Sequence, residues 1–148
     1  MFSRRIIFIK KEEDILLKDD VKFVKIDCSN LFTKDAVFKT FSQKLNFSFV
    51  VDNWDGFNDF FWDADSDGKL PDHIKKLYIY IYNLENLLKK ERKRDRFIFY
   101  SIINEDYNVN AGDEIGNLNF PADIYIYIPE KDKKFIIDTP VEVIYSSN

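Results

Sequence analysis

Four aspartates with helical spacing are the residues of this chain whose types and positions best suit a chemical role. They are Asp52, Asp55, Asp59 and Asp63, spaced three, four and four positions apart. At ~100° per residue this spacing places all four carboxylates on one face of an α-helix, within roughly 80° of arc. Carboxylates in such a row can pair with the cations of a partner, ligate a metal ion, or act as catalytic acid and base.

The element that must position them is a helix over residues 52–63, whose local preferences treat the four acids differently. Asp52 suits the N-cap, and Asp55 in the first turn meets the positive end of the helix dipole. Asp59 has like charges four residues before and after it, and Asp63 lies near the negative end of the dipole. Charge that is kept against local preference predicts a binding face. The other side of this helix carries aromatic residues: Trp54, Phe57, Phe60 and Phe61.

Calcium binding is one alternative use of these acids, because residues 63–68 match the first half of an EF-hand loop, Asp-x-Asp-x-Asp-Gly. The match fails at the ninth position, which is Pro71, and at the twelfth, where Ile74 replaces the bidentate glutamate. A strand, rather than a helix, is expected to follow. We therefore expect a turn with surface acids and no dedicated metal site, while weak calcium binding stays open.

Acid–base catalysis is a second alternative, because side chains four residues apart on a helix can approach the separation of a retaining glycosidase pair. Catalytic carboxylates normally come from separate elements that line a cleft, whereas Asp55 and Asp59 would stand on a convex helix. The single histidine, His73, falls in a loop, and no nucleophile elbow or cofactor fingerprint is present. We therefore expect no enzyme, no catalytic residue and no cofactor.

Composition predicts one α/β domain over residues 1–148 that binds a basic partner. The 148 residues are 45% hydrophobic and 17% aromatic, which favours a folded chain with a sizeable core. The net charge is −4, and residues 52–72 hold seven aspartates but one lysine. This acidity argues against direct nucleic-acid binding. The run 89–96 has six basic residues interleaved with two acids, which favours a solvated helical segment over a nucleic-acid patch.

The cysteine content and the N-terminus indicate the compartment. Cys28 is the sole cysteine, so no intrachain disulfide forms, and we expect a small core residue in a reducing environment. The apolar stretch 6–9 is too short for a signal peptide, and no run approaches a membrane span. We expect a cytoplasmic protein that does not contact membranes and is a monomer when free.

Hydrophobic patterning predicts the elements. The alternating Ile and Tyr of residues 77–82 and 123–128 indicate strands covered on both faces, as in a parallel sheet beneath helices. An aromatic platform for bases is the alternative, and the neighbouring acidic charge argues against it. Further strands are expected at 5–9 and 15–17 (a possible hairpin), 21–27, 135–137 and 141–145. Helices are expected at 33–46, with Thr33 as N-cap, at 52–63 and at 85–107, with a polar loop at 108–120.

These elements predict an α/β fold with a small, mainly parallel β-sheet. Its core has three strands, with extra N- and C-terminal strands, and about three helices pack against it. From residue 24 to residue 82 the order resembles the barstar family of ribonuclease inhibitors. The resemblance is carried by the strand ending in Ile26-Asp27, the helix 33–46, the phrase Asn-Trp-Asp-Gly-Phe-Asn-Asp at 53–59, and the strand 77–82. It is strongest over 22–83 and loose over 84–128.

The resemblance implies a site. In that family the second helix fills the active site of a ribonuclease, and its carboxylates stand where RNA phosphates would lie. The two most important family acids match Asp55 and Asp59. The aromatic residue that precedes the helix falls at Phe49, which lacks the family's tyrosine hydroxyl. Asn58 stands where the family has a tryptophan, and Trp62, one turn later on the same flank, can replace its contact area.

The sequence therefore predicts a barstar-like inhibitor, an immunity protein that binds a ribonuclease or other nuclease toxin. The partner-binding residues are expected to be Asp52, Asp55, Asp59, Asp63, Phe49, Asn58 and Trp62. The alternative is an interaction module that binds another basic protein through the same acidic helix without inhibiting it.

Overall fold

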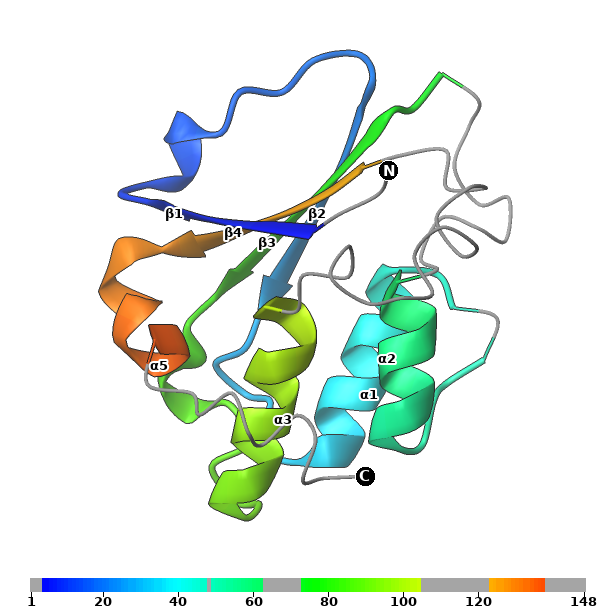
Figure 1. Ribbon diagram of the computed structural model, residues 1–148, viewed down its shortest axis with the longest axis vertical. Helices are drawn as coiled ribbons and strands as arrows, with labels where there is room; N and C mark the ends of the chain where they lie inside the picture. The colour runs from blue at the N-terminus through cyan, green and yellow to red at the C-terminus, as the bar shows by residue number, and fades with distance from the viewer. Residues whose placement is uncertain (1–3, 48, 63–72, 105–122, 138–148) are drawn as a thin grey trace, which may run out of the picture.

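The fold is known from a computed structural model, which describes residues 4–47, 49–62, 73–104 and 123–137. Figure 1 shows a single twisted sheet with helices packed against it. The strands are β1 (Arg4–Ile9), β2 (Val21–Asp27), β3 (Lys76–Tyr82) and β4 (Asp123–Pro129). The helices are α1 (Lys34–Lys44), α2 (Trp54–Trp62), α3 (Lys93–Asn104) and α5 (Lys133–Ile137). Short 3-10 turns are η1 (Glu12–Asp14), η2 (Leu84–Asn86) and η5 (Glu130–Asp132).

The sheet has four strands in the order β1-β4-β3-β2, and every pairing in it is parallel. β3 lies between β2 and β4, with Ile79 opposite Val24 on one side and Ile126 on the other. β1 pairs with β4 at the outer edge. The α/β class, the parallel sheet and the extra N-terminal strand are therefore confirmed.

The hairpin expected near the N-terminus is wrong. Residues 12–14 form η1, and residues 15–17 form no strand, while β1 finds its partner in β4. Leu16 and Leu17 are exposed, so the apolar triplet that suggested a strand buries only Ile15. Three apolar residues are too few to show the alternation of a strand, so the pattern cannot distinguish a strand from a loop with one buried side chain.

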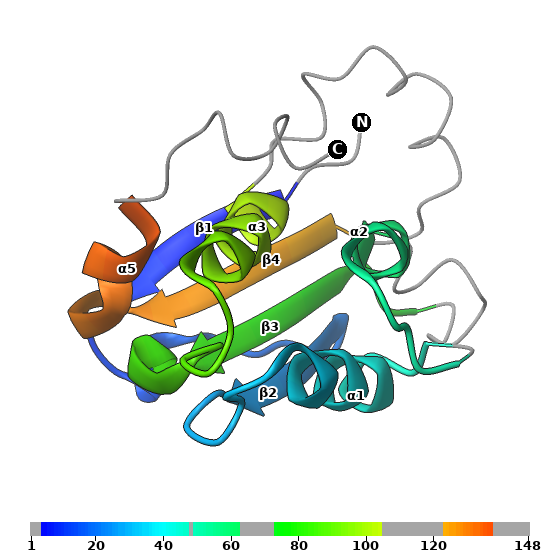
Figure 2. The ribbon, with the colours of Figure 1, turned by 90° about the horizontal axis from the view of Figure 1, so that it is seen from below.

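The two faces of the sheet are covered differently. Leu77, Ile79 and Ile81 of β3 face the main core, to which α1, α2, α3 and α5 all contribute. Figure 2 shows these helices gathered on one side of the sheet. The tyrosines of β3 point to the other side, where Tyr80 packs with Ile9 and Ile15 in a second, smaller cluster. The strands of the sheet are therefore covered on both faces, as expected, but the second face is covered in part by the loop after β1.

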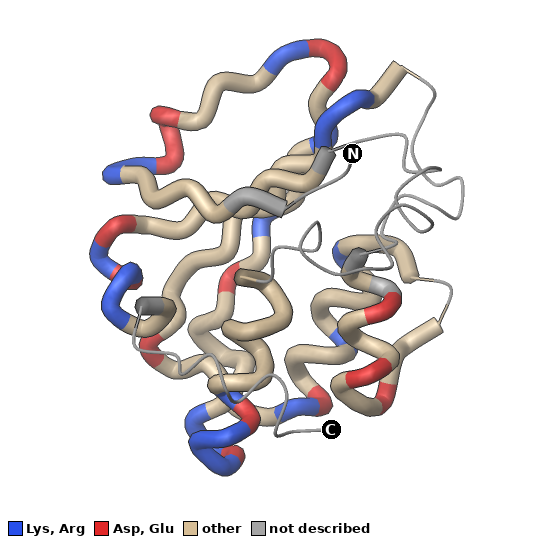
Figure 3. The backbone as a smooth tube through the Cα atoms, in the orientation of Figure 1, with Lys and Arg blue, Asp and Glu red and all other residues tan. Residues whose placement is uncertain are grey.

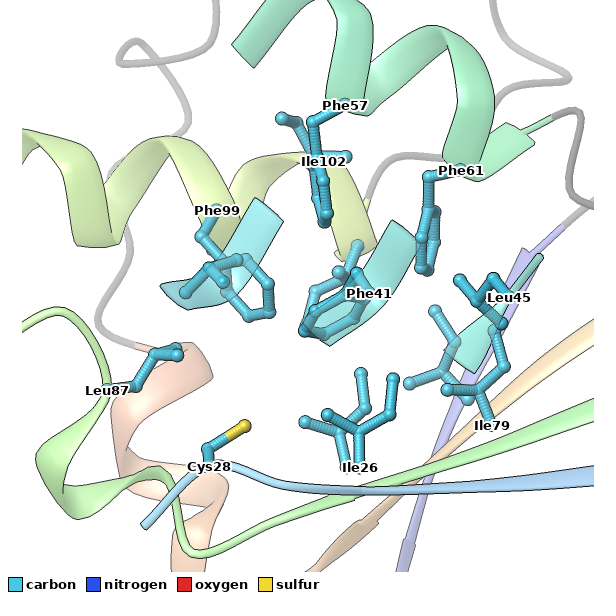
Figure 4. Packing of buried hydrophobic residues seen from close by; sticks show 14 of the residues in the cluster. Ile26, Cys28, Phe41, Leu45, Phe57, Phe61, Ile79, Leu87, Phe99 and Ile102 are labelled. Atoms are coloured by element: carbon cyan, nitrogen blue, oxygen red, sulfur yellow. The ribbon is translucent and has the colours of Figure 1, made fainter. Parts of the chain in front are cut away.

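Aromatic rings fill the space between the helices and the sheet. Figure 4 shows Phe41 of α1, Phe57 and Phe61 of α2 and Phe99 of α3 converging above Ile26 and Ile79. The four phenylalanines have no exposed surface. Cys28 lies in the same core, and burial raises the pKa of its thiol far above the ordinary value, so it stays protonated. The expectation of a core cysteine is confirmed.

α1 begins where its sequence predicts. The Thr33 hydroxyl accepts a hydrogen bond from the Ala36 amide at 3.2 Å, and the Lys34 amide donates to the Glu91 carboxylate at 3.0 Å. Val37, Phe38 and Phe41 form the buried stripe of this helix. Asn46 follows in the left-handed region, at φ 56°, which ends the helix.

Two later segments differ from the expected elements. Residues 85–92 precede α3 as η2 and turns, with Leu88 in the left-handed region at φ 56°, so the helix expected from 85 begins at Lys93. Residues 135–137 belong to α5 and are not a strand. The segments expected at 108–120 and 141–145 lie outside the described residues.

Candidate functional site

The start of α2 is set by one side chain. The Asn53 carbonyl oxygen Oδ1 accepts a hydrogen bond from the Gly56 amide at 2.7 Å, which is the geometry of an N-cap. Asp52 is not the cap, contrary to the sequence expectation, and its Oδ1 accepts from the Asn53 side-chain amide at 2.9 Å. Asp52 therefore orients the capping residue and keeps its own carboxylate exposed. Within the described residues α2 runs from Trp54 to Trp62.

The buried side of α2 fixes how the helix is rotated. Phe57 and Phe61 are fully buried and stack on each other, with ring centroids 5.7 Å apart. Phe41 of α1 meets Phe57 edge-on at 5.2 Å, and Trp54 meets Phe38 edge-on at 5.0 Å. Each of these contacts would be lost if the helix turned about its axis. The predicted aromatic side is therefore confirmed for Trp54, Phe57 and Phe61.

The opposite side of α2 presents carboxylates. Asp52, Asp55 and Asp59 are all exposed, and Figure 3 shows acidic but no basic positions along this helix. Among the residues that the structure describes, no lysine or arginine forms an ion pair with any of the three. Partial burial raises the pKa of Asp59, and the nearby negative charge of Asp55 raises it further. The negative charge of these three aspartates is therefore not neutralised by any lysine or arginine in the described part of the chain.

Apolar side chains lie beside these acids on the segment that leads into α2. Phe49 is 59% exposed and Val50 is 53% exposed, which is unusual for residues of their size in this protein. The same segment is anchored below them, since Phe47 and Val51 are buried and the Val51 amide donates to the Ser42 hydroxyl at 3.2 Å. The predicted contact residue Phe49 is thus exposed two residues before the anchored Val51.

The remaining predicted site residues lie near the end of α2. Asn58 is half-buried, and its Oδ1 is shielded from solvent with no hydrogen-bond partner in the described part of the chain. Trp62 is the last residue of the helix, and the position of its side chain is not described. Asp63 lies outside the described residues, as does most of the calcium-like segment 63–74.

One residue of the site region was missed by the sequence reasoning. The indole Nε1 of Trp54 donates a hydrogen bond to Asp95 Oδ1 at 3.0 Å, and Lys34 Nζ lies 3.8 Å from the same oxygen. Asp95 was read as one of two acids in a solvated basic run, yet it is only 7% exposed. No spacing rule links it to Trp54, because 41 residues separate them and tertiary packing alone brings them together.

Two cavities in the described part of the molecule are lined by residues outside α2. Their volumes are about 420 and 390 Å³, and one lies against the loop after β1 and Phe23, the other between Asn83 and Phe135. His73 is exposed, and no cluster of metal-ligating side chains is present in the ranges that the structure covers. Asp55 and Asp59 stand on the exposed side of α2, where another macromolecule can reach them.

Fold and site together define an α/β protein that displays a row of carboxylates on one helix of a parallel sheet domain. A comparison with protein-family models matches residues 21–114 to the family described as Barstar (barnase inhibitor). The chain belongs to the Barstar family. Comparisons with curated proteins and with solved structures gave no match.

Family membership implies the general role of a ribonuclease inhibitor, and members of the family are inhibitors rather than enzymes. It also supports a ribonuclease as the class of partner. None of the helices described here is long and apolar enough to cross a membrane.

Proposed function

We propose that this protein is an immunity protein that inhibits a nuclease toxin by placing α2 in the enzyme's cationic active site. The carboxylates of Asp55 and Asp59 take the place of RNA phosphates, and Asp52 and Asp63 extend the row. Phe49, Asn58 and Trp62 supply contact area around the acids. The observation that carries this proposal is the exposure of Asp55 and Asp59 without a paired cation among the described residues.

The chemistry of a ribonuclease active site explains why carboxylates suit this role. Such a site must hold cationic groups that neutralise the phosphate of the substrate, and those groups are uncompensated when the enzyme is empty. Carboxylates match the guanidinium fork of arginine in a bidentate geometry, with charge-assisted hydrogen bonds. Two acids one helical turn apart can engage two such cations at once.

The rigidity of α2 also supports the proposal. An inhibitor that already holds its acids in the bound arrangement loses less conformational entropy on association. Phe57 and Phe61 anchor the helix in the core, and Asn53 fixes its first turn. Concentrated negative charge on one face further speeds the encounter with a cationic enzyme. We place this encounter in the cytoplasm, where a producing cell must be protected from its own toxin.

An RNA cleavage assay tests the proposal. Barnase, the enzyme in the family's description, is the first probe, and ribonucleases retained from a host lysate on the immobilised protein and eluted by salt are the second. We expect stoichiometric loss of cleavage for at least one of these enzymes. The double variant Asp55→Asn/Asp59→Asn should restore cleavage at the same inhibitor concentration.

The matched control removes the same charge from the opposite side of the sheet. Asp14 and Asp19 are exposed on the loop after β1, so Asp14→Asn/Asp19→Asn should inhibit like the wild type. A basic partner that binds while its RNA cleavage stays intact would instead favour a non-inhibitory module. Equal inhibition by the Asp55/Asp59 double variant would show that the site lies elsewhere.

A further inference from the structure

Asp95 is the one described carboxylate that joins three helices at a single oxygen. Its Oδ1 accepts the Trp54 indole N–H at 3.0 Å and lies 3.8 Å from Lys34 Nζ. Trp54 is the first residue of α2, Lys34 the first of α1, and Asp95 lies in the first turn of α3. The beginnings of all three helices therefore meet at this carboxylate.

The surroundings of Asp95 make these contacts consequential. The residue is 7% exposed, and a buried carboxylate is costly unless it is hydrogen-bonded or paired. The cation that faces it, Lys34, keeps 38% of its side chain exposed. The indole N–H is thus the closer of its two side-chain partners, at 3.0 Å against 3.8 Å for Lys34 Nζ. An indole N–H inside a protein also needs an acceptor, which Asp95 provides.

The hydrogen bond acts on the turn that carries the inhibitory acids. Trp54 directly precedes Asp55, and Asp59 lies one further turn along the same helix. The Trp54 ring is held edge-on by Phe38 at 5.0 Å and by Phe57 at 5.6 Å, but apolar contacts of this kind allow a ring to slide. A directional hydrogen bond to α3 removes that freedom. The first turn of α2 therefore has a fixed position relative to α3.

We propose that Asp95 is a positioning residue for the inhibitory helix, acting through the Trp54 indole to hold Asp55 and Asp59 in their binding arrangement. This inference rests on the proposed function for its consequence in binding. The coupling of Trp54 to Asp95 itself does not depend on the proposed function. Asp95 itself makes no contact with the target enzyme in this proposal.

Amide hydrogen exchange measured by NMR tests the coupling without any nuclease. Trp54→Phe keeps an aromatic ring but removes the indole donor, Asp95→Leu removes the acceptor, and Asp95→Asn keeps an acceptor at Oδ1. A hydrogen bond to a charged group is strong enough that losing it should speed exchange of the Phe57 and Asn58 amides about tenfold or more. Exchange in β3, at Ile79 and Ile81, should stay within about twofold of the wild type.

The pattern across variants separates positioning from a general loss of stability. Asp95→Asn should retain most of the protection that Asp95→Leu loses. Combining Trp54→Phe with Asp95→Leu should speed exchange no more than the stronger single change, because both remove the same hydrogen bond. Asp35→Asn is the control, since Asp35 also lies in the first turn of a helix but is exposed. It should leave exchange in α2 unchanged.

A binding arm links the coupling to function. With an enzyme that the wild type inhibits, barnase or the captured ribonuclease, Trp54→Phe should raise the inhibition constant about tenfold, mainly through faster dissociation. Asp95→Asn should stay within a few-fold of the wild type in the same assay.

Three results would overturn the inference. They are additive effects of Trp54→Phe and Asp95→Leu, exchange that rises equally in α2 and β3, and α2 exchange that does not change. If Asp95→Leu does not fold, Trp54→Phe with Asp95→Asn still decides the question. If no enzyme is inhibited by the wild type, the proposed function fails, whereas the exchange pattern still tests the coupling.

Discussion

Asp59 lies one helical turn after Asp55 on the exposed side of α2, and the charge of Asp55 adds to the effect of partial burial in raising the pKa of Asp59. Two like charges in this relation destabilise the helix that carries them. The described residues supply no cation to offset the repulsion. A bound partner with cations facing both acids would relieve it, so the strain of the free protein becomes part of the driving force for binding.

The first prediction concerns the relative weight of the two acids in binding. Asp59→Ala should weaken binding to the target ribonuclease most, by about 2–5 kcal/mol, and Asp55→Ala should follow. Partial burial raises the pKa of Asp59 in the free protein, so part of its hydration is already lost before it meets a cation. Inhibition constants for the two single variants check the order. An inhibition constant for Asp59→Ala equal to that of the wild type would contradict this order.

The second prediction concerns stability and pH. Because the folded state raises the pKa of Asp59 above its ordinary value of 3.8, the folded protein binds more protons than the unfolded chain between these two values. The free energy of unfolding therefore falls as pH rises through that interval. Asp59→Asn should be more stable than the wild type at neutral pH, and the difference should vanish below the ordinary pKa. Urea titrations across this pH range measure the difference in unfolding free energy. If Asp59→Asn were less stable than the wild type at neutral pH, the folded state would not disfavour the charge of Asp59.

The third prediction concerns ionic strength. Raising salt from about 0.05 M to about 0.5 M should slow association with the enzyme about tenfold or more, since surface charges are then screened. Stopped-flow association rates give the slope against salt. The Asp55→Asn/Asp59→Asn double variant should show a shallower slope, whereas the Asp14→Asn/Asp19→Asn control should keep that of the wild type. If the association rates of all three proteins had the same salt dependence, the acids of α2 would play no part in the encounter with the enzyme.

The fourth prediction separates the two polar residues before α2. Asn53→Ala removes the oxygen that accepts the Gly56 amide and should lower the free energy of unfolding by about 1 kcal/mol. Asn53→Asp keeps the acceptor for Gly56 but loses the amide that donates to Asp52, so it should cost less than Asn53→Ala. Asp52→Ala should change stability by less than about 0.5 kcal/mol, because its carboxylate is exposed. Chemical denaturation compares the three, and equal losses for Asn53→Ala and Asp52→Ala would contradict the assigned cap.

The fifth prediction contrasts two phenylalanines. Phe57 is fully buried among the rings of Phe41 and Phe61, so Phe57→Ala should cost about 3–5 kcal/mol of stability. Phe49 is 59% exposed, so Phe49→Ala should cost less than about 1 kcal/mol yet weaken inhibition. Thermal unfolding and inhibition constants measured on both variants check the contrast. Unchanged inhibition by Phe49→Ala would exclude it from the contact surface.

The elements that the sequence predicted correctly are those with a long, regular pattern. The Ile–Tyr alternation identified β3 and β4, and Thr33 marked the start of α1. Two of the errors fall on short apolar triplets. The Phe-Ile-Ile triplet of 135–137 suits a strand by composition, but it is too short to carry a period, and it lies in α5 with Ile136 buried. Three residues are too few to distinguish the two-residue repeat of a strand from the 3.6-residue repeat of an α-helix.

The candidate site shows the same division. The two faces of α2 follow from spacing within one helix, so the exposure of Asp55 and the burial of Phe57 were both predictable. The N-cap was assigned to the wrong neighbour, because Asp and Asn are almost equally good caps and the choice depends on the path of the preceding chain. The Trp54–Asp95 hydrogen bond joins two helices that are distant in sequence, which no local pattern can encode.

The pairing of β1 with β4 has a consequence for the chain as it is being made. β1 is translated first, but its partner is the last strand of the sheet, with most of the chain between them. Until β4 emerges from the ribosome, β3 has a bare edge of alternating Ile and Tyr, a pattern prone to strand addition by other chains. Premature termination before residue 123 should therefore yield a product that lacks β4 and aggregates through the uncovered edge of β3.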